Sequence, residues 1–402
     1  MRKLLATAAL LFFAAVLFAA APYHIGIVTG TVSQSEDDLR GAEALIAEYG
    51  AVSNGGIIRH VTYPDNFMDE QETTISIIRG LIDDPLIKAV IVNQGIPGTT
   101  EAFRQIKEQR PDVLCFVGVS QEEPYQIASV ADLILVDDFV SRGYLMMKEA
   151  YELGCKNFIH ISFPRHLAME KVQRRIAIMK ATCEELGMNF ISLSAPDPTS
   201  DVGVAGAQQY ILENTPEWIK QYGTDSAFFC TNAAHTDPLI RQVMAYGAYF
   251  IESELPSPLL GYPGALDLDL SAEAGDFNAI LNKLESRVIE LGGANRFGTW
   301  VYSFGYSVSA GLGQLAIDTI EAELAGKQPY PYNSIRSVRK ALGKYTPGAD
   351  WNGSYYIEPN TGVSYRNYVL VYQDTYIMGG RGYMHNTDLE IPEKYYYLTG
   401  KN

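Results

Sequence analysis

From His24 onward, the chain alternates short apolar runs with segments of helical periodicity. The apolar runs are rich in valine and isoleucine, and the segments between them repeat apolar residues every three or four positions. This alternation predicts βαβ units built on a parallel sheet. The first unit is a strand over 24–30, followed by a helix over 36–49 that ends at Gly50.

The same rhythm continues and then restarts, which predicts two lobes. The first lobe has four further strands, expected over 57–63, 87–93, 113–119 and 133–136, with helices over 69–82 and 99–109. The second lobe has expected strands over 157–161, 189–193, 226–230 and 249–251, with helices over 140–153, 167–186, 205–222, 238–246 and 277–291. We therefore predict an α/β protein with two doubly wound, Rossmann-like lobes joined by a hinge.

The lobe boundaries follow from two breaks in this pattern. Asp137-Asp138-Phe139 is expected to be the first hinge crossing, and the Pro- and Gly-rich stretch 254–263 is expected to be another crossing or a loop over the cleft. The N-terminal lobe would comprise 22–138 and about 295–327, including a helix over 304–324. The C-terminal lobe would comprise 139–294.

Beyond residue 327 the composition changes. Thirteen of the 26 tyrosines lie between Tyr330 and Tyr397, among proline, glycine and asparagine, and one strand-like run covers 368–372. The periodicity is too sparse for a separate core. We expect residues 328–402 to be a Tyr-rich extension that wraps the lobes.

The N-terminus resembles a signal peptide. Arg2 and Lys3 precede an apolar run from Leu4 to Ala21, which predicts export to the periplasm or cell surface, with residues 1–21 as the signal. Pro22 directly follows the run and makes a poor cleavage site. An uncleaved N-terminal anchor that tethers the protein is therefore the alternative.

The charge disfavours one class of partner. The 402 residues carry a formal charge of −16, which loss of Arg2 and Lys3 would make more negative by two. A nucleic-acid-binding protein needs a basic face to replace counterions, so we expect no nucleic-acid partner.

Motifs for metal binding, cofactor binding and catalysis are missing. The histidines lack helical i, i+4 pairing and the four cysteines form no CxxC pair, so we expect no metal and no cofactor. Cys155 and Cys183 flank a predicted strand and helix, and a disulfide between them is left open. No nucleophile elbow or phosphate loop occurs, and we expect no enzyme.

Polar side chains recur where predicted strands end, which is where open α/β sheets bind ligands. In the first lobe these are Thr29, Ser33, Gln34, Asp37, Asn93, Gln94, Ser120 and Gln121. In the second they are Ser162, Arg165, Thr231 and Asn232, with the aromatic Phe163 among them, and Asp138 lies at the hinge. Each residue alone could equally cap a helix or shape a turn. Their recurrence in both lobes predicts two facing sets of hydrogen-bonding groups that close around a small polar molecule.

Four segments carry a family resemblance: HIGIVTGTVSQSEDDLRGAEALIAEYG, VIVNQGIPGTTEAF, FIHISFPRHLAMEKVQRR and FFCTNAAHTDPLIRQ. They resemble the type I periplasmic binding proteins over about 22–327, and more narrowly an uncharacterised branch known by a domain-of-unknown-function label. The resemblance implies a ligand held between the lobes and delivered to a membrane permease or sensor. The Tyr-rich extension departs from the usual plan, and Val32 stands where sugar receptors have an aromatic residue, which disfavours a sugar ligand.

Two kinds of side chain have competing interpretations. Arg165 would clamp a carboxylate or phosphate with both nitrogens, or form a surface salt bridge. Phe163, Tyr262 and Tyr302 would stack on a flat ligand ring, or pack in the core and hinge.

The resulting hypothesis is an exported solute-binding protein for an ABC-type import or sensing system. One alternative is an exported hydrolase or isomerase that uses the same cleft, with Asp37, Asp138 and His235 as acid-base groups. The other is an interaction protein that contacts its partner through the Tyr-rich extension.

Overall fold

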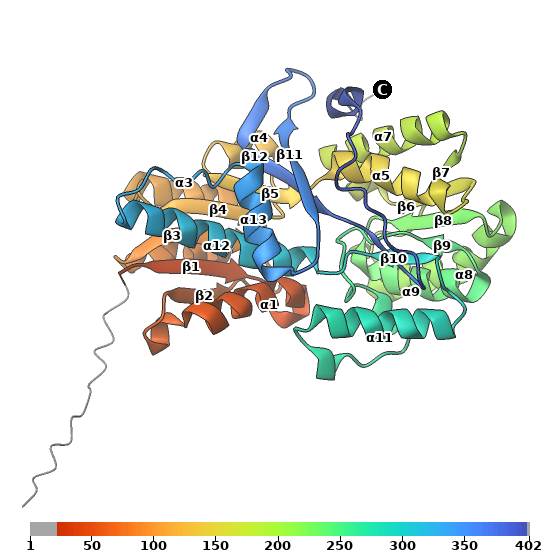
Figure 1. Cartoon of the computed structure of the whole chain (residues 1–402), viewed down its shortest axis with the longest axis horizontal. Coiled ribbons are helices and arrows are strands. Elements are labelled where there is room, and N and C mark those ends of the chain that lie inside the picture. The colour runs from red at the N-terminus through yellow and green to blue at the C-terminus, as the bar shows by residue number, and fades with distance from the viewer. Residues whose placement is uncertain (1–21, 400–402) are drawn as a thin grey trace, which may run out of the picture.

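The computed structural model describes residues 22–399 and contains two α/β lobes side by side (Figure 1). Each lobe is built on one seven-stranded sheet. The prediction of two α/β lobes is therefore confirmed. The predicted signal, residues 1–21, lies outside the described residues. Among residues 22–399, no helix combines the length and apolar character needed to span a bilayer.

The N-terminal sheet has the strand order β11-β12-β5-β4-β3-β1-β2. Its strands are β1 (His24–Thr29), β2 (Ile58–Thr62), β3 (Ile87–Asn93), β4 (Leu114–Gly118), β5 (Leu133–Asp137), β11 (Trp351–Ile357) and β12 (Ser364–Gln373). β1 to β5 are parallel, and β12 adds a further parallel strand beside β5. β3 and β5 are almost wholly buried, which explains their continuous apolar runs, because helices cover both faces of a parallel sheet.

The C-terminal sheet has the order β14-β13-β10-β9-β8-β6-β7. Its strands are β6 (Asn157–Ser162), β7 (Asn189–Ser194), β8 (Ser226–Cys230), β9 (Tyr249–Phe250), β10 (Phe297–Thr299), β13 (Tyr376–Met378) and β14 (Gly382–Tyr383). β10 is parallel to β9, whereas β13 and β14 add antiparallel pairs at the edge.

Helices pack around both sheets. They are α1 (Val32–Tyr49), α2 (Gln71–Gly80), α3 (Thr99–Gln109), α4 (Pro124–Ala128), α5 (Phe139–Glu152), α6 (Pro164–Leu167), α7 (Glu170–Leu186), α8 (Gly203–Tyr222), α9 (Ala233–Tyr246), α10 (Tyr262–Ala265), α11 (Phe277–Glu290), α12 (Phe304–Leu324) and α13 (Ile335–Tyr345). The long helix α12 packs on α1, α13 and the N-terminal sheet, so the chain returns to the first lobe after β10. In the second lobe, α5 packs on α7 and α8 packs on α9.

Within residues 22–399, the chain passes between the two sheets at three places. The first lies between β5 and α5, the second between β10 and α12, and the third between β12 and β13. The second and third crossings are bonded together, because the Tyr302 amide donates to Gln373 Oε1 at 3.0 Å. The stretch predicted as a crossing or a loop, 254–263, leads from β9 to α10 within the second lobe and lies along the cleft.

Two segments are placed differently from the sequence-based boundaries. β10 pairs with β9 and β13, so residues 297–299 belong to the C-terminal sheet and the return to the N-terminal lobe begins after them. The Tyr-rich extension, expected to wrap the lobes, supplies β11 and β12 to one sheet and β13 and β14 to the other. In Figure 1 its blue ribbon reaches from the first lobe to the second. Strands this short, or rich in Gly, Asn and Ser, carry little alternating pattern to predict them from.

Arg142 lies at the hinge and is almost fully buried. Its guanidinium pairs with Asp137 at the end of β5 and with Glu252 after β9, where Nε and Oε1 are 2.6 Å apart. It also donates to the carbonyl of Ser253 at 2.8 Å and lies over the Trp300 ring. Burial alone would raise the pKa of Asp137, but the charge of Arg142 holds it below its usual value. This cluster, which we call the hinge cluster, joins the first crossing to the loop along the cleft.

All four cysteines are buried and unbonded to one another. Cys155 and Cys183 belong to one apolar cluster, where the sulfur atoms of Cys183 and Met147 lie 3.3 Å apart. Burial raises the pKa of the Cys183 thiol to about 12, which keeps it protonated. These cysteines therefore act as small apolar core residues.

Candidate ligand-binding cleft

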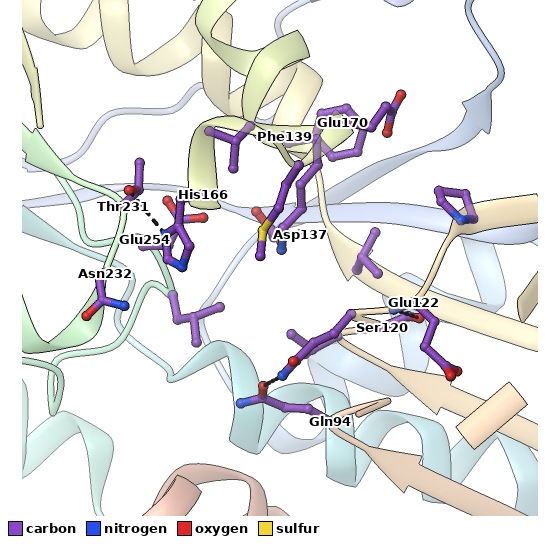
Figure 2. A pocket seen from close by; sticks show the side chains of 18 of the residues that line it. Gln94, Ser120, Glu122, Asp137, Phe139, His166, Glu170, Thr231, Asn232 and Glu254 are labelled. Atoms are coloured by element: carbon purple, nitrogen blue, oxygen red, sulfur yellow. Dashed lines mark hydrogen bonds between the residues drawn. The ribbon is translucent and has the colours of Figure 1, made fainter. Parts of the chain in front are cut away.

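The carboxyl ends of β3 and β4 face those of β6 and β8 across a cleft between the lobes. Each of these strands is followed by a short connection to a helix, and residues in or just after these connections line the cleft. In Figure 2, Thr231, Asn232 and His166 lie on one side of the cleft, and Ser120 and Glu122 lie on the other. This is the place where doubly wound sheets bind ligands.

The larger hollow in the cleft, which we call the main cavity, has a volume of about 330 Å³. Its walls come from both lobes: Gln94, Ser120, Gln121 and Glu122 from the first, and His166, Lys171, Thr231 and Asn232 from the second, with Asp137, Glu254 and Leu255 from the hinge side. Apolar residues such as Val119 and Leu260 line it too. This mixture of apolar wall and few polar groups is typical of small-molecule sites.

A second hollow, the side cavity, has a volume of about 240 Å³. It is lined by the start of α1, the residues after the Ser303 cap of α12, and the loop 255–260. Gln94, Val119, Ala233, Leu255 and Leu260 line both hollows, so the two form one continuous cleft. Gln94 stands at their junction, where its Oε1 accepts a hydrogen bond from Gln121 Nε2 at 2.9 Å.

About half of the residues selected from the sequence line this cleft. They are Gln34, Asp37, Gln94, Ser120, Gln121, Arg165, Thr231 and Asn232. Asn232 also caps α9, because its Oδ1 accepts from the Ala234 amide at 2.9 Å. Ser120 Oγ accepts from the Glu122 amide at 3.3 Å. Their positions permit ligand contact, and that contact stays a prediction.

Thr29, Ser33 and Asn93 do not line either cavity. Thr29 is buried and its hydroxyl donates to the carbonyl of Gly30 at 2.9 Å. Ser33 points outward and donates to Asp65 at 2.7 Å. Asn93 is buried beneath the cleft, where its Nδ2 donates to Ser309 Oγ at 2.8 Å. These short polar side chains satisfy nearby groups instead of facing a ligand.

Asp138, Ser162 and Phe163 are also turned away from the cleft. Asp138 caps α5, with its Oδ1 accepting from the Ser141 amide at 2.8 Å, and lines a separate hollow beneath the C-terminal segment. The Ser162 and Thr231 hydroxyls are hydrogen-bonded at 2.7 Å inside the second lobe. Phe163 is fully buried and packs 4.2 Å from the His166 ring.

The competing interpretations of Arg165 and the aromatic residues are decided by their contacts. Arg165 forms a bidentate salt bridge with Asp197, with distances of 2.7 and 2.9 Å, at the rim of the main cavity. Tyr262 and Tyr302 lie in the core of the second lobe. The Tyr262 hydroxyl donates to the Gly298 carbonyl at 2.6 Å, so this ring packs in the fold.

The acid-base trio of the enzyme alternative is not gathered in one place. Asp37 lines the side cavity, whereas Asp138 lines the separate hollow at the hinge. His235 is buried and lines none of the cavities named here, and its Nε2 lies 3.1 Å from the Pro196 carbonyl. These three residues therefore do not form one acid-base site.

Several lining residues were missed by reading strand ends. His166, Lys171 and Glu254 come from a helix start, a helix and a loop. His166 Nδ1 lies 3.2 Å from Thr231 Oγ1, and burial lowers the pKa of its imidazole. Glu254 pairs with the buried Arg175. The segment FPRH, directly after β6, was the available signal for His166.

Two neighbouring carboxylates, Asp37 and Asp38, lie at the side cavity. Asp38 is 1% exposed, and its Oδ1 accepts from Asn93 Nδ2 at 3.2 Å. Ser257 Oγ donates to Asp37 Oδ2 at 2.8 Å. Burial raises the pKa of Asp37, and burial with the neighbouring Asp37 charge raises that of Asp38 to about 7.

This arrangement predicts a pH effect on stability. A carboxyl whose pKa rises from 3.8 unfolded to about 7 folded makes folding less favourable as pH rises through that window. At about 1.4 kcal/mol per pKa unit, the loss is up to about 4 kcal/mol. Asp37 is the titratable group whose charge also raises the pKa of Asp38. We expect Asp38→Asn to flatten the fall in stability between about pH 4 and 7, measured by urea unfolding; an unchanged profile would contradict the raised pKa.

Comparison with known structures supports the class of fold. The structure matches, with a TM-score of 0.76 and 20% identity, a protein from Clostridium difficile 630 described as a transcriptional regulator, covering 88% of this chain and 99% of that one. It also matches a sugar ABC transport substrate-binding protein from Bordetella parapertussis 12822, with a TM-score of 0.51, 10% identity and 94% of each chain covered. The chain has the fold of the type I periplasmic binding proteins, as the sequence resemblance predicted.

The family is defined by sequence. A family model described as "Protein of unknown function (DUF3798)" matches residues 23–298, and the chain belongs to this family. A second family model matches residues 309–398. Two proteins from Treponema pallidum (strain Nichols) are similar: one is 42% identical over 44% of this chain and 80% of its own length. The other is 34% identical over 52% of this chain and 94% of its own length.

Proposed function

We propose that the protein is an exported solute-binding protein that closes its two lobes around a small polar ligand and presents it to an ABC-type importer or a membrane sensor. The observation that carries this proposal is the continuous cleft. It lies between the carboxyl ends of two parallel sheets, and both lobes contribute polar side chains to its walls.

Three features support the proposal. The fold is that of the type I periplasmic binding proteins, and one structural match is described as the substrate-binding protein of a sugar ABC transport system. The three crossings allow the lobes to rotate about the hinge while each keeps its own core. The apolar run from Leu4 to Ala21 supports export.

The test is ligand-induced stabilisation of purified protein that has been unfolded and refolded to remove bound ligand. A panel of amino acids, amines, nucleosides, sugars and small acids is screened by thermal unfolding. A ligand present at about 100 times its dissociation constant adds about 2.7 kcal/mol to stability. We expect one chemical class in the panel to produce such a shift.

Closure of the two lobes around the ligand provides a second test. A true ligand should reduce the radius of gyration in small-angle X-ray scattering, because hinge rotation brings the lobes together. Introducing a bulky side chain at Ala233, which lines both cavities, should block the shift without changing unfolding of the free protein. A panel with no thermal shift would argue against the proposal, and turnover of a compound in the cleft would replace it with an enzyme.

A further inference from the structure

The side cavity has an unusual charge balance. Glu36, Asp37 and Asp38 line it, and no arginine, lysine or histidine is found among the described residues that do so. Glu36 is neutralised from outside by Arg40 at 2.8 Å. Within residues 22–399, Asp37 and Asp38 form no such ion pair, and the donors that reach them are uncharged side chains.

The hydrogen bonds from Asn93 and Gln94 to Asp38 are long, whereas Ser257 Oγ donates to Asp37 Oδ2 at 2.8 Å. Asp38 Oδ2 accepts from Gln94 Nε2 at 3.4 Å, and Asn93 reaches Oδ1 at 3.2 Å. Asp37 Oδ1 is buried and has no hydrogen-bond partner in the part of the chain that the structure describes. Burying carboxylates so incompletely satisfied is costly unless something else compensates them.

The surrounding backbone is shaped to admit these carboxylates. Ser35 departs from helical geometry, with φ −160° and ψ 84°, and so bends the start of α1 just before Asp37. Gly305, in the first turn of α12, lies against Asp38. A Cβ at this position would overlap the Asp38 carboxylate. The site is therefore built from two elements, one before and one after the second lobe in the chain.

We infer that the side cavity binds a protonated amine of the ligand, with Asp37 and Asp38 as its counter-charges. An ammonium or guanidinium group supplies the donors that Asp37 Oδ1 lacks and the positive charge that the lining lacks. Gln94, at the junction of the cavities, orients Asp38 toward the ligand. The rest of the ligand extends into the main cavity. This inference rests on the proposed function and narrows the ligand to amines.

The charged residues of the main cavity distinguish two classes of amine ligand, a basic amino acid and a polyamine. Lys171 and Arg165 are the cations among its described lining residues, and Arg165 is already paired with Asp197. An amino acid with an extended basic side chain would place its carboxylate near Lys171. A polyamine would instead meet the carboxylates of Glu170 and Glu254.

The experiment uses four probes on the stripped protein: spermidine, L-arginine, L-glutamate and D-ribose. Thermal unfolding identifies the probes that stabilise the protein, and isothermal titration calorimetry gives the affinities. We expect spermidine or L-arginine to bind, and we expect L-glutamate and D-ribose to leave the protein unchanged. Preference for L-arginine supports the amino acid as source, and preference for spermidine supports the polyamine.

Asp38→Asn and Asp37→Asn then locate the amine. Removing one partner of a buried charge pair weakens binding strongly, and we expect a loss of about 30-fold or more in affinity for the amine that binds. Glu43→Gln is the matched control, because Glu43 is an exposed carboxylate on the same helix, paired with Arg40 and outside the cavity lining. We expect less than about a 3-fold change for it.

Each variant is also unfolded without ligand, which separates a binding defect from a folding defect. Because the buried charge is removed, Asp38→Asn should unfold no more easily than the wild-type protein at pH 8. Binding of L-glutamate or D-ribose, with no response to amines, would overturn the amine assignment and leave the proposed function standing. Amine binding that both variants retain would also overturn it, and silence from all four probes would count against it too.

Discussion

Replacing Arg142 with alanine should destabilise the protein by about 3–5 kcal/mol, because Asp137 and Glu252 would be left buried without their counter-charge. The guanidinium is 2% exposed and contacts two carboxylates and two backbone carbonyls. Removing it therefore leaves several buried acceptors unsatisfied at the hinge. Urea unfolding at neutral pH measures the loss.

Two further variants make this result specific. Arg104→Ala is the control, since Arg104 pairs only with exposed Glu101 and Glu108 on α3 and should cost less than about 1 kcal/mol. Combining Arg142→Met with Asp137→Asn and Glu252→Gln removes all three charges together and should recover much of the stability. A cost below about 1 kcal/mol for Arg142→Ala would show that the hinge cluster does not hold the crossings together.

Ending the chain after residue 350 should abolish cooperative folding. The truncation removes β11 to β14, so β5 and β10 lose a neighbouring strand in their respective sheets. It also removes Trp351, Val369 and Ile377 from the buried cores, each at most 2% exposed. Circular dichroism with thermal unfolding, and size-exclusion chromatography, would report loss of the transition and aggregation through the open sheet edges.

A shortened turn provides the control for this truncation. Glu358 and Val363 are hydrogen-bonded at 2.9 Å across the turn between β11 and β12, and residues 359–362 are mostly exposed. Replacing 359–362 with a two-residue turn keeps both strands and should change stability little, because loop length alone is inexpensive. A truncated chain that still unfolds cooperatively would mean that the Tyr-rich segment is dispensable for the fold.

The truncation result bears on the hypothesis that the protein contacts a partner through its Tyr-rich extension. Tyr368, Tyr372 and Tyr395 are buried in the N-terminal core or between the lobes. Side chains in such positions stabilise the fold and are not displayed to a partner. Deleting the extension to look for lost partner capture would therefore test folding instead.

The central strands were predictable because the apolar residues that identify them are neighbours in the sequence. β1, β3 and β5 are largely buried, and each appears in the sequence as a mostly apolar run. β10, β13 and β14 were not predictable, because two or three residues define no period. β11 contains Asn, Gly and Ser, and only its partner β12 identifies it as a strand.

The candidate site was partly predictable for a similar reason. A polar residue at a strand end is brought to the cleft by the sheet itself, as for Gln94, Ser120 and Asn232. The same position also favours local bonds, and short side chains such as Thr29 and Asn93 form them. No local rule places Asp38 against Gly305, since these residues meet only when α12 returns to the first lobe.

β11 to β14 follow all the other strands in the sequence, so they are synthesised after them. β12 lies between β5 and β11, so the edge of the first sheet beside β5 is completed only after residues 351–373 have been synthesised. β13 pairs with β10, so the edge of the second sheet beside β10 is also completed late. Both sheets are therefore completed only after residues 351–383 have emerged from the ribosome, and the emerging chain keeps the edges beside β5 and β10 open until then. Such late completion of the two sheets would suit the proposed export, in which the chain crosses a membrane before it folds.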